Sequence, residues 1–195
     1  SGTGTEGTDY ATVSDITIAA GATTGTTSFT PTDDTIYESN ETGIIFIATV
    51  SGGSATENST PQTQTLTITE NESTPTVTLT SSASSIAENA GSSLTLTATL
   101  SVATTANVTV GISTSGTGTE GGDYATVSDI TITAGSTTGT ASFTPTDDST
   151  FEGDETGIIA IDTVTGGSAT ENGTQSVTIT ISEDDSGPSF SISLS

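Results

Sequence analysis

Apolar residues and hydroxyl-bearing residues alternate along much of this chain. Between residues 75 and 185 the alternation falls into separate stretches, with Gly, Asn or Pro between them. Side chains of a strand point to opposite faces with a period of two, so such stretches predict half-buried strands. Seven strands in about 110 residues predict an all-β fold, an antiparallel sandwich of immunoglobulin-like shape. The predicted strands lie at 77–79, 94–100, 108–112, 130–132, 141–143, 159–163 and 177–181.

The chain also repeats itself. Residues 1–54 match residues 115–168 at 42 of 54 positions, and after one deletion the match continues to residues 72 and 185. Self-similarity of this length indicates tandem copies of one domain. We therefore expect the C-terminal two thirds of one repeat at 1–72, a complete repeat at 75–185, and the first strand of a following repeat at 186–195.

Both ends of the sequence fall in mid-repeat, which favours a window taken from a longer tandem array. The alternative is a processed subunit whose ends pair with its neighbours. Residues 186–195 are long enough to replace one strand that the first repeat lacks. They are too short to replace the whole missing part, which corresponds to residues 75–114.

The composition excludes several classes of partner and of chemistry. The chain has 24 acidic residues and no Lys, Arg, His, Cys, Met or Trp. Nucleic acids and anionic membrane surfaces are excluded as partners because their recognition needs Lys and Arg. Zinc, haem, iron–sulfur, disulfide and Ser-His-Asp chemistry are excluded as well. No apolar run is long enough to insert directly into a membrane. Carboxylate, hydroxyl and carbonyl oxygens remain, and these are the ligands of hard cations such as Ca²⁺.

The acidic residues of the complete repeat are clustered between the predicted strands. Five lie at 147–155, three at 183–185, and single ones at positions 88 and 123. Loops of a Greek-key sandwich gather at its ends, so these groups are expected to converge. At an effective dielectric near 20, two charges about 4 Å apart repel by about 4 kcal/mol. The sequence leaves two alternatives open: the carboxylates share divalent cations, or they stay apart in solvated loops.

Three sequence motifs of the complete repeat resemble those of a known domain family. They are Gly-Thr-Glu-Gly-Gly-Asp-Tyr at 118–124, Asp-Asp-Ser-Thr-Phe-Glu-Gly-Asp-Glu at 147–155, and Thr-Ile-Ser-Glu-Asp-Asp at 180–185. In order and spacing the repeat resembles the Calx-beta domain, known from sodium–calcium exchangers, an integrin β subunit and large bacterial surface proteins. The resemblance implies a seven-stranded β-sandwich that binds a cluster of Ca²⁺ at one end.

The resemblance also implies a set of metal ligands. In the complete repeat these are Glu88, Asp123, Asp147, Asp148, the Thr150 carbonyl, Glu152, Glu155, Glu183, Asp184 and Asp185. In the first repeat they are Asp9, Asp33, Asp34, Glu38, Glu41, Glu70 and Glu72. The first repeat has Asn71 where the second has Asp184, and nothing in residues 1–72 corresponds to Glu88. We therefore expect fewer or weaker ions in the first repeat.

Other motifs have simpler explanations. Gly116–Gly121 and Gly2–Gly7 fit G-x-G-x-x-G, but a dinucleotide loop needs a helix behind it and none is predicted. Asp185-Ser186-Gly187 imitates an aspartic-protease signature without a second lobe. Paired carboxylates suit glycoside hydrolysis, but few aromatic residues are present to bind sugar. We therefore predict that the chain is not an enzyme. Five Asn residues start N-x-Ser/Thr sequons: Asn40, Asn58, Asn71, Asn107 and Asn172.

Two functions follow as hypotheses. The first is a structural, Ca²⁺-rigidified repeat of a large extracellular or cell-surface protein, an adhesin stalk or filament, whose partners are neighbouring repeats and other copies of the chain. The absence of Cys favours this structural hypothesis, because calcium would stabilise the fold in place of disulfides. The second is a calcium sensor that regulates a partner protein, by analogy with the exchanger.

Overall fold

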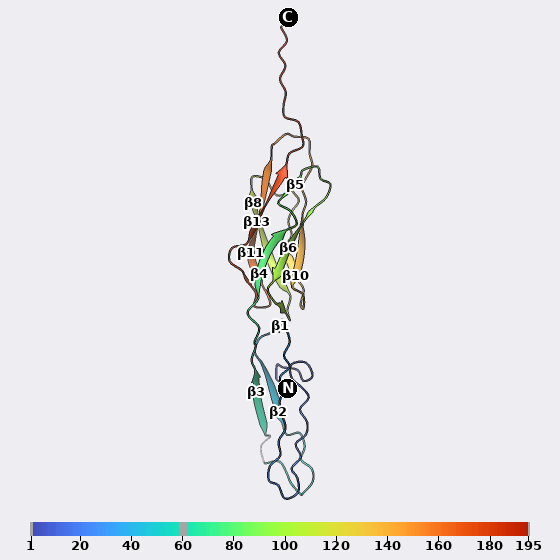
Figure 1. Ribbon diagram of the computed structural model, residues 1–195, viewed down its shortest axis with the longest axis vertical. Helices are drawn as coiled ribbons and strands as arrows, with labels where there is room; N and C mark the ends of the chain where they lie inside the picture. The colour runs from blue at the N-terminus through green and yellow to red at the C-terminus, as the bar shows by residue number, and fades with distance from the viewer. Residues whose placement is uncertain (1, 59–61, 195) are drawn as a thin grey trace. The chain divides into compact units, whose positions relative to one another are not determined.

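A computed structural model describes residues 2–58 and 62–194 of the chain. The chain forms two compact units, unit 1 (Ser1–Glu72) and unit 2 (Ser73–Ser195). Every regular element in the described ranges is a β-strand (Figure 1). Among these residues there is accordingly no helix long and apolar enough to cross a membrane. The all-β class that the alternation predicts is confirmed.

Unit 2 consists of two β-sheets. In the five-stranded sheet the order is β5 (Ser85–Ala87), β13 (Ser176–Ser182), β11 (Glu155–Thr165), β8 (Val108–Gly116) and β9 (Ile130–Ile132). In the four-stranded sheet the order is β10 (Thr138–Phe143), β6 (Leu94–Leu100), β4 (Thr76–Ser81) and β12 (Thr170–Glu171). A further two-residue strand, β7, spans Ala103–Thr104.

All seven predicted strands are present, as β4, β6, β8, β9, β10, β11 and β13. Their pairings within unit 2 are antiparallel. Three short strands of unit 2, β5, β7 and β12, were not predicted, because none of them contains two apolar residues in alternation. β5 pairs parallel to β13, and β12 pairs parallel to β4. Both therefore extend the sheets at points where the alternation gives no signal.

The core of unit 2 lies between the two sheets. The apolar member of each alternating pair faces inward, so that Val77, Leu96, Ile130, Ile159 and Ile179 are completely buried. Their neighbours along the strands are mostly Thr, which suits strands because it is β-branched. The largest buried side chains are Tyr124 and Phe143. Their rings stack with centroids 4.8 Å apart.

Gly157 makes room for this aromatic pair. A Cβ atom at Gly157 would lie 2.8 Å from Cε2 of Phe143 and 3.6 Å from a ring carbon of Tyr124. Gly157 lies in β11, two residues after Glu155, which begins that strand. The strand that makes room for the aromatic pair therefore continues directly from the acidic loop. Only glycine fits there without moving the ring.

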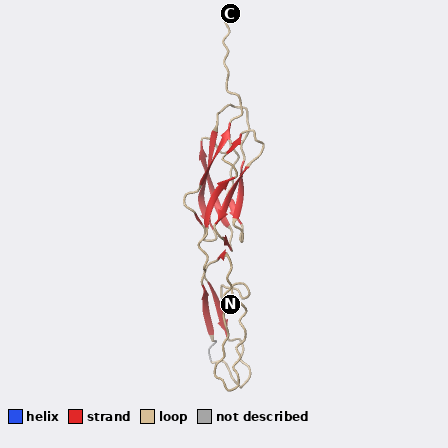
Figure 2. Cartoon of the chain, in the orientation of Figure 1, coloured by secondary structure: helices blue, strands red, loops and turns tan. Residues whose placement is uncertain are grey.

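Unit 1 has the corresponding sequence but far less regular structure. Its strands are β1 (Ile36–Tyr37), β2 (Glu41–Phe46) and β3 (Thr63–Ile68), and the rest of its described chain is loop (Figure 2). β2 and β3 pair antiparallel, as their counterparts β11 and β13 do. Tyr10 and Phe29 keep the aromatic contact, with centroids 4.7 Å apart.

The core of unit 1 is open. Ile16 and Ile18 are 55% and 56% exposed, whereas their counterparts Ile130 and Ile132 are completely buried. In unit 2 these residues are covered by strands that belong to residues 75–114, which have no counterpart in residues 1–72. The predicted sandwich is therefore complete in unit 2, while unit 1 contributes one two-stranded sheet.

Gly157→Ala tests the aromatic packing. The added methyl group has to displace the Phe143 ring, so we expect unit 2 to lose about 1–3 kcal/mol of unfolding free energy. Urea unfolding followed by circular dichroism measures this loss. Gly187→Ala is the matched control, because a Cβ there meets only ordinary contacts with Phe151, the nearest at 3.6 Å. Equal midpoints for the two variants would contradict the packing described.

Candidate metal centre

Acidic residues from distant parts of unit 2 meet at one end of its sandwich. Glu88 follows β5, and the parallel pairing of β5 with β13 brings it beside the segment 183–185. The amide of Glu88 donates a hydrogen bond of 3.0 Å to the carbonyl of Ser182. The loop between β10 and β11 supplies the residues from Asp147 to Asp154. Asp148 in that loop donates its amide to Oε1 of Glu88 at 3.3 Å.

The carboxylates form three overlapping groups. Within each group, one oxygen from every member lies within 4.8 Å of the others. Glu88 belongs to two groups and Glu152 to two, so that the three groups are linked in a row. This is the geometry in which neighbouring cations share bridging carboxylates. The groups are Glu88/Glu183/Asp184, Glu88/Asp148/Glu152 and Asp123/Glu152/Glu155.

Seven of the ten positions that the resemblance implies for the second repeat are therefore brought together. Asp147, Thr150 and Asp185 belong to none of the groups found in the described part of the chain. The amide of Thr150 donates to Oδ1 of Asp148 at 2.6 Å, which shapes the loop. Oδ2 of Asp185 is buried and has no hydrogen-bond partner in the structure. The service of all ten positions as ligands stays a prediction.

Glu183 is held by the backbone of two segments. Its Oε2 accepts the amides of Glu152 at 2.6 Å and Gly153 at 2.7 Å. Its Oε1 accepts the amides of Asp184 at 3.0 Å and Asp185 at 2.8 Å. These amides, first that of Glu152, hold the pKa of Glu183 below its usual value.

Four donors occupy about all the lone-pair sites that a carboxylate offers. Glu183 therefore ties the central acidic loop to the segment after β13, and an ion that binds it has to compete with these amides. The resemblance implies a ligand at this position, and the hydrogen bonds give it a second, organising role.

Asp123 is placed by the glycine-rich loop before it. Its Oδ2 accepts the amide of Thr119 at 2.6 Å and the hydroxyl of Thr119 at 2.8 Å. The Thr119 amide is the main reason that the pKa of Asp123 is lowered. The next residue, Tyr124, is 1% exposed and anchors the loop to the core. Asp123 is thus fixed and ionised at the edge of the centre.

Several neighbouring carboxyl groups have raised pKa values. Burial raises the pKa of Glu155, and the charge of Asp123 and a hydrogen bond with it raise this pKa further. Burial also raises the pKa of Glu88, and the charge of Glu183 adds to the effect. The pKa of Glu152 is raised by burial first and then by Asp123. Without a cation, the centre therefore favours protons on some of its carboxyl groups.

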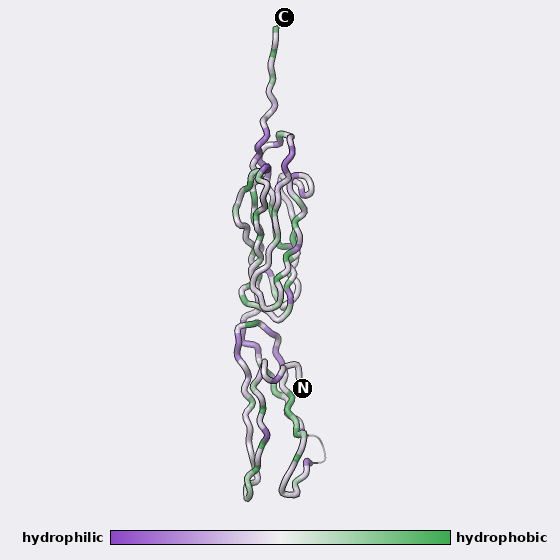
Figure 3. Tube along the Cα trace, turned by 90° about the vertical axis from the view of Figure 1, so that its right-hand side faces the viewer, coloured by the Kyte–Doolittle hydropathy of each residue, from purple (hydrophilic) through white to green (hydrophobic). Residues whose placement is uncertain are grey.

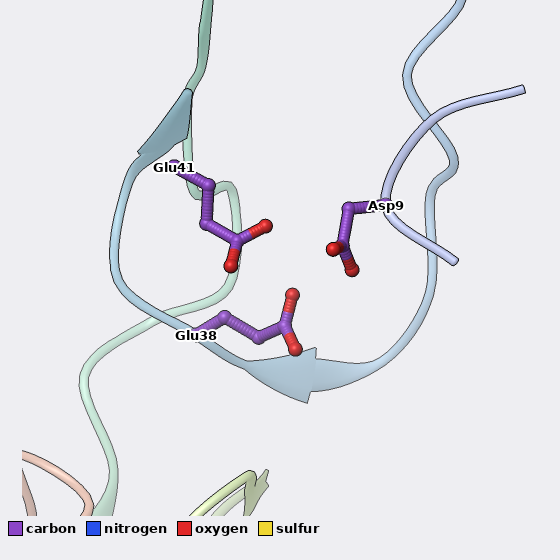
Figure 4. Close-up of side chains that lie close together, drawn as sticks. All are labelled: Asp9, Glu38 and Glu41. Carbon is purple, nitrogen blue, oxygen red and sulfur yellow. The ribbon is translucent and has the colours of Figure 1, made fainter. Parts of the chain in front are cut away.

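Unit 1 retains part of this arrangement. Its group consists of Asp9, Glu38 and Glu41, the counterparts of Asp123, Glu152 and Glu155 (Figure 4). Glu38 and Glu41 lie on one stretch of chain, just after β1 and at the start of β2, and Asp9 points toward them from another segment. Burial raises the pKa of Glu38 and of Glu41. One surface pocket is lined by all seven acidic residues implied for this repeat: Asp9, Asp33, Asp34, Glu38, Glu41, Glu70 and Glu72.

Glu70 repeats the organising role of Glu183. Its carboxylate accepts the amides of Glu38, Asn71 and Glu72. Burial alone would raise its pKa, but these amides lower it. The pKa of Glu72 is raised, mainly by a hydrogen bond with Glu70.

The two units differ where Asn71 replaces Asp184. Nδ2 of Asn71 donates to Oδ1 of Asp33 at 3.0 Å. The corresponding residues of unit 2, Asp184 and Asp147, are both carboxylates and cannot form this bond when ionised. The groups that contain Glu88 have no equivalent in unit 1. Within the described residues, unit 1 therefore offers one carboxylate group and unit 2 offers three.

Two residues that organise the centre of unit 2, Asn89 and Asp154, are not among the residues that the resemblance implies. Asn89 donates Nδ2 to Oδ2 of Asp184 at 2.6 Å and so positions a carboxylate. Asp154 accepts the amide of Glu183 at 3.1 Å, and Asn40 accepts that of Glu70 at 2.9 Å in the same way. For Asp154 the sequence offered a signal. Asn40 stands at the corresponding position of the first repeat, and both side chains have an oxygen that can accept a backbone amide.

Comparison with known proteins identifies the family. The profile of the Calx-beta domain matches residues 1–72 and residues 70–185. This chain belongs to the Calx-beta domain family. Several solved structures resemble this Calx-beta chain, and the likeness of the two that follow concerns the fold alone. No curated protein matches it.

The first is the crystal structure of the apo-form Calx CBD1 domain. It is 18% identical, has a TM-score of 0.47, and the match covers 56% of this chain and 99% of that one. The second is the crystal structure of CBD12 from CALX1.2. It is 19% identical with a TM-score of 0.45, over 52% of this chain and 42% of that one.

Some carboxyl groups of the centre have raised pKa values and others have lowered ones, so the stability of unit 2 should change with pH in two opposite stages. In metal-free buffer, unit 2 should gain stability as the pH falls from about 7, because Glu155, Glu88 and Glu152 bind protons more tightly when folded. At lower pH it should lose stability, as the pH passes the lowered pKa values of Asp123 and Glu183. Stability should therefore peak at mildly acidic pH.

Urea midpoints between about pH 7 and pH 3 test this, without metal and with excess calcium. Calcium should raise stability most at neutral pH, where the carboxylates are ionised, and so remove the peak. A metal-free chain that loses stability steadily from pH 7 downward would contradict the shifts described.

Proposed function

We propose that this chain is a calcium-binding structural segment of a large extracellular surface protein, an adhesin stalk or filament, in which Ca²⁺ rigidifies the repeats and their joints. The observation that carries the proposal is the row of three carboxylate groups in unit 2. The chain has no Lys, Arg or His with which to neutralise them. An external cation is therefore the available counter-charge at neutral pH.

The donor set favours calcium among the common cations. Ca²⁺ takes six to eight oxygen ligands in flexible geometry, and carboxylates that bridge neighbouring ions suit it. Softer metals prefer thiolate or imidazole ligands, and this sequence has neither Cys nor His. Calx-beta membership and the acidic clusters support the same choice.

The position of the centre supports a role at the joint between repeats. Asp185 leads directly into Ser186-Gly187-Pro188, the start of the following segment. The ring of Phe151, in the central acidic loop, lies close enough to contact a Cβ placed on Gly187. An ion that orders the loop would thus also restrict the segment that follows it. The partners proposed are neighbouring repeats and other copies of the chain.

An extracellular setting fits the absence of cysteine. Extracellular calcium modules bind at about 10⁻⁴–10⁻³ M, a range that external calcium fills. Binding to the folded state adds RT ln(1 + [Ca²⁺]/Kd) to its stability. Calcium would thus do in this chain what disulfides do in many secreted domains. We propose no catalytic role for the chain.

The second candidate is a calcium sensor that acts on a partner protein. The difference between three groups in unit 2 and one in unit 1 favours it, since unequal sites fill at different calcium concentrations. A sensor needs affinity near the submicromolar range of cytosolic calcium. The two proposals therefore differ in affinity, which a single titration measures.

Thermal unfolding with Ca²⁺ titrated from about 1 µM to 10 mM after chelation tests both. We expect the melting temperature to rise with a midpoint near a millimolar. A midpoint below a micromolar would replace the structural proposal with the sensor. No shift at any concentration would leave the carboxylates as solvated loops and end the calcium proposal.

Reciprocal substitutions locate the binding. Asp184→Asn removes one carboxylate from unit 2 and should weaken calcium binding several-fold, while its amide oxygen still accepts from Asn89. Asn71→Asp breaks the bond to Asp33 and should destabilise unit 1 without calcium, because two carboxylates then face each other.

With calcium, Asn71→Asp should bind ions more tightly than the wild type. Isothermal titration calorimetry and melting curves measure both variants. If both substitutions change calcium affinity in the same direction, the assignment of these two positions is wrong.

A further inference from the structure

One of the five sequons lies wholly in an open turn of unit 2. Asn172, Gly173 and Thr174 lie between β12 and β13, and all three residues are exposed. Within the described residues, the side chain of Asn172 makes no hydrogen bond. A Cβ atom placed on Gly173 would meet nothing within 4 Å, so the space around the turn is open. The side-chain nitrogen of Asn172 is therefore accessible for modification.

Backbone bonds fix this turn without using the Asn172 side chain. The amide of Asn172 donates to the carbonyl of Val77 in β4 at 2.9 Å, and the amide of Gly173 donates to that of Glu171 at 3.1 Å. Nε2 of Gln175 donates to the carbonyl of Asn172 at 2.6 Å. Gly173 has a φ of 65°, which glycine adopts without strain. A group attached to Nδ2 of Asn172 would leave all of these bonds in place.

The other sequon of unit 2 is held within a sheet. Oδ1 of Asn107 accepts the amide of Ala134 at 2.9 Å. The third residue of this sequon, Thr109, lies in β8 between Thr131 of β9 and Thr165 of β11. A sequon needs both its Asn and its hydroxyl residue. A strand paired on both sides therefore presents the sequon at Asn107 less openly than the turn presents that at Asn172.

Two sequons of unit 1 belong to its acidic centre. Oδ1 of Asn40 accepts the amide of Glu70 at 2.9 Å, and Nδ2 of Asn71 donates to Asp33 at 3.0 Å. A glycan on Asn71 would have to replace the bond to Asp33. The fifth sequon starts at Asn58 and continues into residues 59 and 60, which lie outside the described residues.

The two repeats share a sequon at one position. Asn172-Gly-Thr of the second repeat corresponds to Asn58-Ser-Thr of the first, so the Asn and the hydroxyl residue are kept although the middle residue differs. At the two other positions that can be compared, the second repeat has Asp154 in place of Asn40 and Asp184 in place of Asn71. The sequence comparison thus selects the same sequon that the structure leaves open.

We propose that Asn172 is an N-glycosylation acceptor, an inference that rests on the extracellular setting of the proposed function. The donor is an oligosaccharide carried on a lipid pyrophosphate. A bond forms between Nδ2 of Asn172 and the first carbon of the sugar, and the bond from that carbon to the pyrophosphate breaks. Nδ2 gives up one proton. Surface loops of secreted proteins are where such acceptors occur.

The acceptor lies apart from the acidic centre. β13, which is seven residues long, separates the turn from the segment 183–185. Figure 3 shows the acidic end as a hydrophilic region next to the start of the C-terminal segment. A glycan on Asn172 would instead lie beside β4, to which β12 pairs only at Thr76 and Val77. It would cover that edge of the sheet without reaching a proposed calcium ligand.

Secretion of the 195-residue chain from a yeast host tests the proposal, because the secretory pathway supplies a high-mannose oligosaccharide. The chain has no Lys or Arg, so it is cleaved at acidic residues before mass spectrometry of the glycopeptides. We expect a glycan on Asn172 in most molecules. Thr174→Ala should abolish it, since the sequon loses its hydroxyl while Asn172 stays. Thr170→Ala is the matched control, because it removes an exposed hydroxyl outside the sequon and should keep the glycan.

The glycan should leave the fold and the calcium centre unchanged. We expect the glycosylated wild type and Thr174→Ala to melt at the same temperature and to have the same calcium midpoint. A secreted wild-type chain without a glycan on Asn172 would overturn the proposal, and so would a glycosylated chain that melts below Thr174→Ala. Glycosylation without calcium binding would overturn the calcium proposal alone. Calcium binding with an unmodified Asn172 would overturn this inference alone.

Discussion

Mutual repulsion among carboxylates at one end of a sandwich is the constraint on which this structure depends. Seven of them lie in three linked groups, and the chain contains no basic side chain to offset them. At an effective dielectric near 20, each pair of charges about 4 Å apart costs about 4 kcal/mol. Burial first, and this repulsion after it, raise the pKa values of Glu155, Glu88 and Glu152. A cation or a proton would relieve this repulsion, and we propose a cation at neutral pH.

The backbone makes this arrangement possible. Glu183 accepts four amides from two segments, and Glu70 accepts three in the same place of unit 1. These bonds fix the acidic loop next to the segment that ends the repeat, so the charges cannot move apart. Tyr124 and Phe143 anchor the opposite side of the centre in the core, through Asp123 and Gly157. The site is therefore rigid on both sides, and the ions would fill a preformed end of the sandwich.

Much of the fold could be predicted from alternation, and less of the centre. All seven predicted strands of unit 2 follow from their period of two, whereas β5 and β12 contain no alternating pair of apolar residues. Yet β5 is what brings Glu88 to the terminal carboxylates. The gathering of loops at the ends of a Greek-key sandwich predicted that these groups converge, but not the strand pairing that produces the convergence. The amides around Glu183 also left no trace in the sequence, because any residue supplies a backbone donor. The open core of unit 1 could be anticipated only in part, since exposure of Ile16 and Ile47 depends on strands that residues 1–72 do not contain.

The central claim is that the acidic end of unit 2 holds several cations that share carboxylates. Counting bound calcium per chain by equilibrium dialysis at neutral pH, for the wild type and for Glu152→Gln, tests it most directly. Glu152 belongs to two of the three groups, so the account predicts more than one ion per wild-type chain and the loss of more than one in the variant. Glu38→Gln, the matched change in unit 1, should remove at most one. A wild-type chain that binds no calcium at millimolar concentration, or a Glu152 variant that binds as many ions as the wild type, would contradict the account.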